Sequence, residues 1–222
     1  MSRQTLNQRS LLLADLHDRS LIIDTREIFL HSNFDTDSND EEPGVDYRMA
    51  LTFEKNIRFL EYLVPDKPIF IHQHCIGGEV NDGLAIYDII NASRCHITIL
   101  AYAQASSMSS VILQAADLRL LMPNTELLIH YGDMSLDGVV TAILSTTARM
   151  AWFKDKLLHI YAERCQKTQI FMHKNIEEIC SFLDDKITKH VDWFLSAEEA
   201  VAYGFADGII GDSKYKHISD LI

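Results

Sequence analysis

An alternation of short apolar runs with amphipathic segments constrains the fold of this chain most strongly. The runs Ile69-Phe70-Ile71 and 96–100 are rich in β-branched residues, which is typical of buried strands. Apolar residues then recur at helical spacing in 80–90 and again in 111–116. Because strands joined through helices lie side by side and parallel, the pattern predicts an α/β fold with helices covering a largely parallel sheet.

The same periodicities predict the remaining elements. Residues 1–26 are expected to form an N-terminal arm, and 27–222 are expected to form one domain. The stretch 35–44 is acidic and rich in turn-forming residues, which predicts a solvated loop. The further elements that we expect are strands at 20–23, 27–30, 118–122, 126–130 and 209–210, and helices at 46–63, 139–165, 176–183 and 196–204.

Charge and cysteine usage exclude several classes of protein. The formal net charge of −12 argues against a nucleic-acid partner, since such proteins carry a basic surface. The cysteines Cys75, Cys95, Cys165 and Cys180 are scattered, which fits a reducing compartment better than a disulfide framework. No apolar run reaches membrane-spanning length, and the N-terminus lacks the apolar stretch of a signal peptide. We therefore expect a soluble cytoplasmic protein with no membrane partner.

A serine-rich turn at 101–110 links the predicted strand 96–100 to the helix 111–116. A serine held at such a turn becomes a nucleophile when a general base reaches it. Serines are also frequent helix caps, so the turn alone leaves both interpretations open.

Four segments, taken in order along the chain, resemble the ClpP family of serine proteases, the proteolytic subunits of ATP-dependent protease machines. The resemblance covers 27–210 and implies a ClpP/crotonase-like fold with stacked ββα units and a projecting handle at about 136–190. The segments are Gly77-Gly78 before a helix, Gln104-Ala105-Ser106-Ser107-Met108, Leu128-Ile129-His130, and Asp192-Trp193-Phe194-Leu195-Ser196-Ala197.

The resemblance also implies a role for five residues. Ser107 would be the nucleophile, His130 the general base and Asp192 the acid that orients the imidazole. The oxyanion hole would come from the backbone N–H groups of Gly78 and Met108. The implied activity is that of a serine endopeptidase that cleaves unfolded polypeptides inside a chamber of homo-oligomeric rings. An AAA+ unfoldase is the implied partner, and no cofactor or metal is implied.

The long segment 139–165 contains neither Gly nor Pro, so we expect a helix that outgrows its domain and projects. In the resembled family this segment is the handle that pairs two rings. We therefore expect its apolar residues to contribute to a subunit contact, namely Ile143, Met150, Phe153 and Leu157.

Several positions differ from the family pattern. Ala103 and Ser109 stand where the family usually has Gly, and Ile76 stands where Pro precedes the two glycines. Tyr131-Gly132 replaces the usual Gln-Pro after the histidine. These positions flank the expected substrate-binding edge, so they are expected to affect peptide preference more than catalysis.

Other residues offer competing site assignments. Ser106, Ser109 and Ser110 are rival nucleophiles, but Ser107 is the serine that precedes Met in the matching register. His72 and His74 lie two apart on a predicted strand and therefore share a face, but a zinc site would need further ligands, and a polar edge is favoured. Nothing in the sequence activates the neighbouring thiol of Cys75, which is read as a bystander.

Two alternative functions remain. A crotonase-fold acyl-CoA enzyme would use paired N–H groups but would need no serine nucleophile. A non-catalytic ClpP-like ring subunit would only assemble or bind partners. The presence of Ser107, His130 and Asp192 favours the peptidase over both alternatives.

Overall fold

The structure is a computed structural model that describes residues 6–31, 44–133 and 135–222. The acidic loop predicted at 35–44 lies outside these residues, except for Gly44. The elements are α1 (Leu6–Arg19), β1 (Leu21–Ile22), β2 (Glu27–His31), α2 (Tyr47–Leu63), β3 (Ile69–Cys75), α3 (Val80–Ala92), β4 (Ile97–Ser106), α4 (Met108–Leu113), β5 (Leu118–Leu121), β6 (Glu126–Ile129), α5 (Val140–Cys165), α6 (Ile176–His190), β7 (Trp193–Leu195), α7 (Ala197–Tyr203) and β8 (Gly208–Ile209), with 3₁₀ turns at Gln169–Phe171 and Ile218–Asp220.

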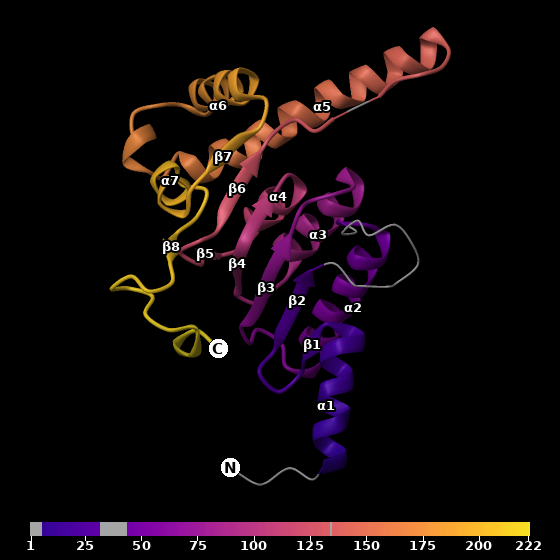
Figure 1. Cartoon of the computed structure of the whole chain (residues 1–222), viewed down its shortest axis with the longest axis vertical. Coiled ribbons are helices and arrows are strands. Elements are labelled where there is room, and N and C mark those ends of the chain that lie inside the picture. Colours follow the sequence, from indigo (N-terminus) through magenta and orange to yellow (C-terminus); the bar gives the residue numbers. More distant parts are fainter. Residues whose placement is uncertain (1–5, 32–43, 134) are drawn as a thin grey trace.

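One mostly parallel sheet organises the chain (Figure 1). Its order is β1-β2-β3-β4-β5-β8, and β6 pairs with both β4 and β7. The pairs β2–β3, β3–β4, β4–β5, β5–β8 and β4–β6 are parallel, whereas β1–β2 and β6–β7 are antiparallel. The predicted α/β fold with a largely parallel sheet is confirmed.

Strand β4 changes partner along its length. Its first half, Thr98–Ala101, pairs with β5, and its last residues, Gln104–Ser106, pair with β6. The change occurs across Ala103, which has a φ of 53° and lies where the β3–β4 register shifts. This irregularity is a β-bulge, in which an extra residue in one strand bends the strand and changes the direction of the residues that follow. The bulge therefore brings the end of β4 to the end of β6.

The two faces of the sheet are covered differently. Along β3, Ile69 and Ile71 belong to the main core beneath the helices, whereas Phe70 belongs to a second cluster on the opposite face. Helices α2 and α3 lie on the main-core side (Figure 1), and the C-terminal residues Tyr215 and Ile218 pack against the second cluster. This alternation is what period-2 side-chain geometry requires of a strand buried on both faces.

Local sequence signals fix the ends of the helices. The Asp46 side chain caps α2 by accepting a hydrogen bond of 2.9 Å from the Met49 N–H. Ser196 and Glu199 form a capping box at the start of α7, and Gly204 ends that helix in the left-handed region with a φ of 90°. An acidic or serine N-cap and a C-terminal glycine are common start and stop signals for helices.

Helix α5 forms as predicted, and its N-terminal half extends away from the body of the protein (Figure 1). The assignment of Phe153 and Leu157 to a subunit contact is wrong, because they are only 4% and 2% exposed within this chain. They pack into the main core, where the second half of α5 crosses the domain. The large apolar side chains exposed on and beside the projecting half include Leu136, Val139, Val140, Leu144 and Trp152.

Two features of the C-terminal third were not predicted. Helix α6 continues to His190 rather than ending at Leu183, because Ile179, Leu183 and Ile187 sustain one buried stripe. Strand β7 follows and pairs antiparallel with β6. A three-residue strand gives too short an alternation to be recognised by periodicity.

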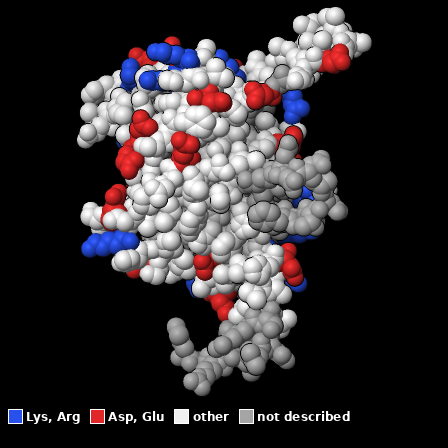
Figure 2. All heavy atoms as spheres, viewed as in Figure 1, with Lys and Arg blue, Asp and Glu red and all other residues white. Residues whose placement is uncertain are grey.

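Charges are distributed unevenly over the surface. Acidic side chains are scattered across the face shown in Figure 2, and basic ones gather over α6, which carries Lys186 and Lys189.

None of the helices within the described residues has the length and apolar character needed to cross a membrane.

Candidate active site

Ser107 occupies the sharp turn between β4 and α4. Its backbone has φ 53° and ψ −126°, a conformation that residues other than glycine rarely adopt. The turn is held from both sides, because the Ser107 N–H donates to the Leu128 carbonyl (2.8 Å) and the Ser110 N–H donates to the Ser107 carbonyl (3.0 Å). Such over-determined strain is characteristic of functional positions.

His130 reaches Ser107 because of the pairing of the strands. Parallel pairing places Leu128 beside Ser106, and His130 is the first residue after β6. The distance from His130 Nε2 to Ser107 Oγ is 2.8 Å, which is a hydrogen bond. The predicted nucleophile and base are thus adjacent in the structure.

Asp192 is brought to the other ring nitrogen by β7. Antiparallel pairing sets Trp193 opposite Ile129, so the preceding Asp192 lies beside His130. Asp192 Oδ1 is 3.1 Å from His130 Nδ1. The Asp192 side chain is 51% exposed, compared with 18% for His130. A tight γ-turn precedes it, in which the Asp192 N–H donates to the His190 carbonyl across Val191, whose φ is 66° and ψ −65°.

The Gly77-Gly78 segment packs directly against the serine turn. A Cβ on Gly77 would lie 2.6 Å from Ser107 Cβ and 2.9 Å from the Met108 nitrogen. Val45 fixes the segment from behind, since its N–H donates to the Gly77 carbonyl (2.6 Å) and its carbonyl accepts from Glu79 (2.8 Å). The backbone of Gly78 is thereby held next to Ser107 and Met108.

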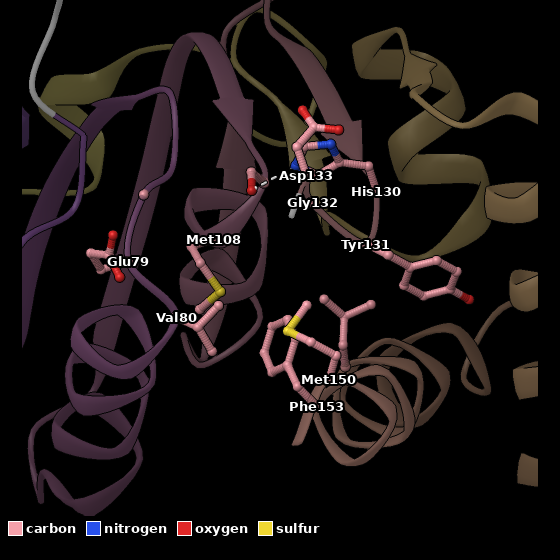
Figure 3. A pocket seen from close by; sticks show the side chains of 12 residues that line it. Glu79, Val80, Met108, His130, Tyr131, Gly132, Asp133, Met150 and Phe153 are labelled. Carbon is pink, nitrogen blue, oxygen red and sulfur yellow. Dashed lines mark hydrogen bonds between the residues drawn. The ribbon is translucent and has the colours of Figure 1, made fainter. Parts of the chain in front are cut away.

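A pocket of about 300 Å³ opens beside Ser107 and His130 (Figure 3). Its lining includes both residues of the predicted oxyanion hole, Gly78 and Met108. Figure 3 shows Met150 and Phe153 of α5 facing Met108 and Val80 of the main body. Sequence reasoning missed this role, because the α5 residues are far away in the sequence and their spacing indicated only an apolar stripe. The rest of the lining is Glu79, Tyr131, Gly132, Asp133 and Leu157.

Two of the three rival serines, Ser109 and Ser110, are engaged elsewhere. Ser109 and Ser110 are fully buried. Ser110 Oγ donates to the Ser107 carbonyl (2.6 Å) and lies 2.6 Å from the hydroxyl of Tyr161. The buried amide of Gln73 donates to both the backbone carbonyl and the hydroxyl of Ser109. Both hydroxyls therefore serve the interior.

The histidines of β3 do not join the pocket lining. His72 has both ring nitrogens occupied, Nδ1 by the Tyr102 hydroxyl and Nε2 by the Glu27 carboxylate, each at 2.7 Å. Within the described part of the chain, no group of three or more His, Cys, Asp or Glu could hold a metal ion. Cys75 is fully buried, which removes its thiol from contact with a substrate.

Comparison with known proteins assigns the chain to a family. The family model described as Clp protease matches residues 16–213. A relative from Streptococcus suis is 30% identical over 183 residues, covering 78% of this chain and 83% of the relative. One from Deinococcus radiodurans is 28% identical over 172 residues, covering 77% and 78%, and one from Chlorella vulgaris is 27% identical over 152 residues, covering 68% and 69%.

All three relatives are named ATP-dependent Clp protease proteolytic subunit. The match spans most of this chain, and the fold is the one expected from the resemblance in the sequence. The chain therefore belongs to the Clp protease family.

Proposed function

We propose that this chain is a serine endopeptidase that cleaves unfolded polypeptides with Ser107, His130 and Asp192. The observation that carries the proposal is the continuous series of hydrogen bonds from Ser107 Oγ through His130 to Asp192 Oδ1. Membership of the Clp protease family supports the reaction class.

The geometry suits acyl transfer. A carboxylate only accepts hydrogen bonds, so Asp192 places the proton of neutral His130 on Nδ1 and leaves Nε2 free to accept from Ser107. Ser107 Oγ attacks the scissile carbonyl carbon as its proton passes to Nε2. The C–N bond then breaks, and His130 returns the proton to the leaving amine. Water, deprotonated by the same imidazole, then attacks the acyl carbon, and the imidazole returns the proton to Ser107 Oγ as the ester C–O bond breaks.

Backbone donors complete the proposed mechanism. Met108 begins α4, so its N–H has no acceptor within the helix, and Gly78 borders the same pocket. We assign these two N–H groups to the oxyanion that forms on the carbonyl. The apolar pocket walls from Met150 and Phe153 suit an apolar substrate side chain next to the cleaved bond.

Assembly and partners follow from the family. Because the relatives are named proteolytic subunits of an ATP-dependent protease, we propose homo-oligomeric rings and an AAA+ unfoldase that delivers unfolded chains. The exposed apolar residues of projecting α5, such as Leu144 and Trp152, suit a contact between copies. The four cysteines are free thiols, which suits the cytoplasm.

Two alternatives are less well supported. The chemistry of a crotonase-type acyl-CoA enzyme does not require a serine that is hydrogen-bonded to a histidine–carboxylate pair. A non-catalytic ring subunit would not need the strained backbone that aims Ser107 at His130.

The decisive experiment is labelling with a fluorophosphonate probe together with hydrolysis of a fluorogenic peptide. Ser107→Ala should abolish both activities, since the hydroxyl is the attacking atom. Sedimentation of the same samples reports whether the assembly is preserved.

Ser106→Ala is the matched control, because it removes a neighbouring hydroxyl of the same turn. It should retain labelling. Labelling that persists in Ser107→Ala and disappears in Ser106→Ala would reject this nucleophile, and a wild type that neither labels nor cleaves would reject the peptidase.

A further inference from the structure

Tyr131, the residue after His130, is bound by the side chains of two helices. Its hydroxyl donates to Asp184 Oδ1 of α6 at 2.6 Å. Lys154 of α5 lies 2.7 Å from the same carboxylate oxygen and 5.0 Å from the centre of the Tyr131 ring. Thr188 adds a hydrogen bond of 3.2 Å to that oxygen. These residues, Tyr131, Asp184, Lys154 and Thr188, are called the tyrosine clamp below.

The clamp and the triad engage opposite sides of one short segment. Consecutive side chains of an extended chain point in opposite directions, so His130 faces Ser107 while Tyr131 faces away. Figure 3 shows the Tyr131 ring turned away from Met108 and Val80. The Cα atoms of neighbouring residues are about 3.8 Å apart, so a displacement of Tyr131 moves His130 as well.

The two residues that follow Tyr131 are held less closely. Gly132 and Asp133 are exposed. Among the described residues, none has an atom within 4 Å of the place where a Gly132 Cβ would lie. The position of His130 therefore depends on β6 on one side and on the tyrosine clamp on the other.

The two carboxylates that hold this segment come from α6 and from the turn that follows it. Asp184 lies within the helix, and Asp192 follows its last residue, His190, through the γ-turn at Val191. Asp184 holds Tyr131, and Asp192 holds His130. Because only Val191 separates the end of α6 from Asp192, a shift of α6 and this turn would affect both hydrogen bonds.

We infer that Tyr131 and Asp184 are positioning residues for His130, and that the tyrosine clamp keeps the imidazole in line with Ser107. This inference rests on the proposed function. It also gives a role to Tyr131, one of the positions at which this chain differs from the family pattern.

The protonation states of Tyr131 and Asp184 at neutral pH favour the hydrogen bond between them. Burial and the hydrogen bond to Asp184 raise the pKa of Tyr131 above its ordinary value. The hydrogen bonds from Lys154 and from Tyr131 lower the pKa of Asp184. The phenol therefore remains a donor and the carboxylate an acceptor throughout the neutral range.

The test compares Tyr131→Phe with Tyr102→Phe. Tyr102 is a matched control, because it is also half-buried, it lies outside the pocket lining, and its hydroxyl also makes one hydrogen bond, of 2.7 Å, to His72. Tyr131→Phe should lower kcat about tenfold, since it impairs alignment of the general base. KM should stay within about twofold, because the ring remains and the apolar walls are untouched. Probe labelling should slow by the same factor as kcat.

A purely structural role predicts a different outcome. It would lower the melting temperature of both Tyr→Phe variants and leave both kcat values unchanged, which would overturn the inference. Asp184→Ala adds a second check: combined with Tyr131→Phe it should lower kcat little more than either change alone, because each change removes the hydrogen bond between Tyr131 and Asp184.

The experiment also separates this inference from the proposed function. Ser107→Ala in the same assays shows whether hydrolysis depends on the triad at all. If it does not, crystal structures of wild type and Tyr131→Phe decide the inference. A Ser107–His130 separation widened beyond hydrogen-bond distance in the variant supports positioning, and an unchanged separation overturns it.

Discussion

Gly77→Ala is the substitution whose effect follows most directly from the geometry. Gly77 has a φ of 94°, in the region that disfavours a side chain. Its new Cβ would lie 2.6 Å from the Ser106 carbonyl oxygen and 2.6 Å from Ser107 Cβ. Ordinary contact begins at 3.4 Å, so the two segments must separate by roughly 0.8 Å.

This separation moves the proposed oxyanion donor of Gly78 away from Ser107 and Met108. A misplacement of about 1 Å costs catalysis on the order of 100-fold. We therefore expect kcat to fall by about 100-fold, equivalent to about 2.7 kcal/mol of transition-state stabilisation. The positive φ adds about 1–2 kcal/mol of destabilisation to the fold, as it would for any residue with a Cβ.

Gly211→Ala separates the loss of fold stability caused by backbone strain from the loss of kcat. Gly211 has a φ of 102°, and no described atom lies within 4 Å of its would-be Cβ. Both variants should lose similar unfolding free energy to backbone strain, but Gly211→Ala should keep its kcat. Peptide hydrolysis and denaturant unfolding measure the two quantities. A Gly77→Ala protein that keeps more than about a third of wild-type kcat would refute the reasoning, because the contact would then be relieved without moving the donors.

Two further predictions concern carboxylates. Asp192→Asn should lower kcat by about 10⁴ by favouring the wrong tautomer of His130, and a loss of less than about tenfold would mean that another group orients the ring. Asp207 binds the buried Arg119 through both carboxylate oxygens. Burial alone would raise the pKa of Asp207, but the hydrogen bonds and charge of Arg119 outweigh it and lower the pKa below 3.8. The stability from this pair is therefore present above the unfolded-state pKa and is lost as pH falls through the folded-state value. Asp207→Asn should cost about 2–4 kcal/mol of unfolding free energy at pH 7, and the difference from wild type should shrink below about pH 4 in denaturant titrations. A difference that does not change with pH would contradict the pairing.

The sequence predicts most of the fold because its signals are local. Capping residues such as Asp46 and Ser196 define helix starts, and β-branched runs define the central strands. Strand β7 was not predicted because three residues are too few to show a periodicity. Its pairing with β6 also depends on residues that are far apart in the sequence. The assignment of Phe153 and Leu157 to a subunit contact was wrong because it too depended on tertiary packing. An apolar helical stripe indicates burial, but it does not say whether the same chain or a partner buries it.

The candidate site divides in the same way. Ser107, His130 and Asp192 were recognised from their sequence motifs, and the structure brings them together. Tyr131 was placed at the substrate-binding edge, but neither its hydrogen bond to Asp184 nor the place of Met150 in the pocket was recognised, because both depend on how α5 and α6 pack. Such packing is set by the tertiary fold and cannot be inferred from the spacing of residues in the sequence.

Three strained positions show how the fold aims these groups. Ala103, Ser107 and Val191 all have positive φ although none is glycine, and each lies in or next to an element that carries a triad member. Ala103 lies in the bulge that brings β4 to β6, Ser107 is itself the proposed nucleophile, and Val191 turns the chain into Asp192. A β-branched residue at positive φ is locally unfavourable, so the surrounding structure must impose it. The hydrogen bonds on both sides of Ser107 and the pairing of β7 with β6 supply that constraint. Local propensity therefore fails at these positions because tertiary contacts fix the backbone where the proposed chemistry needs it.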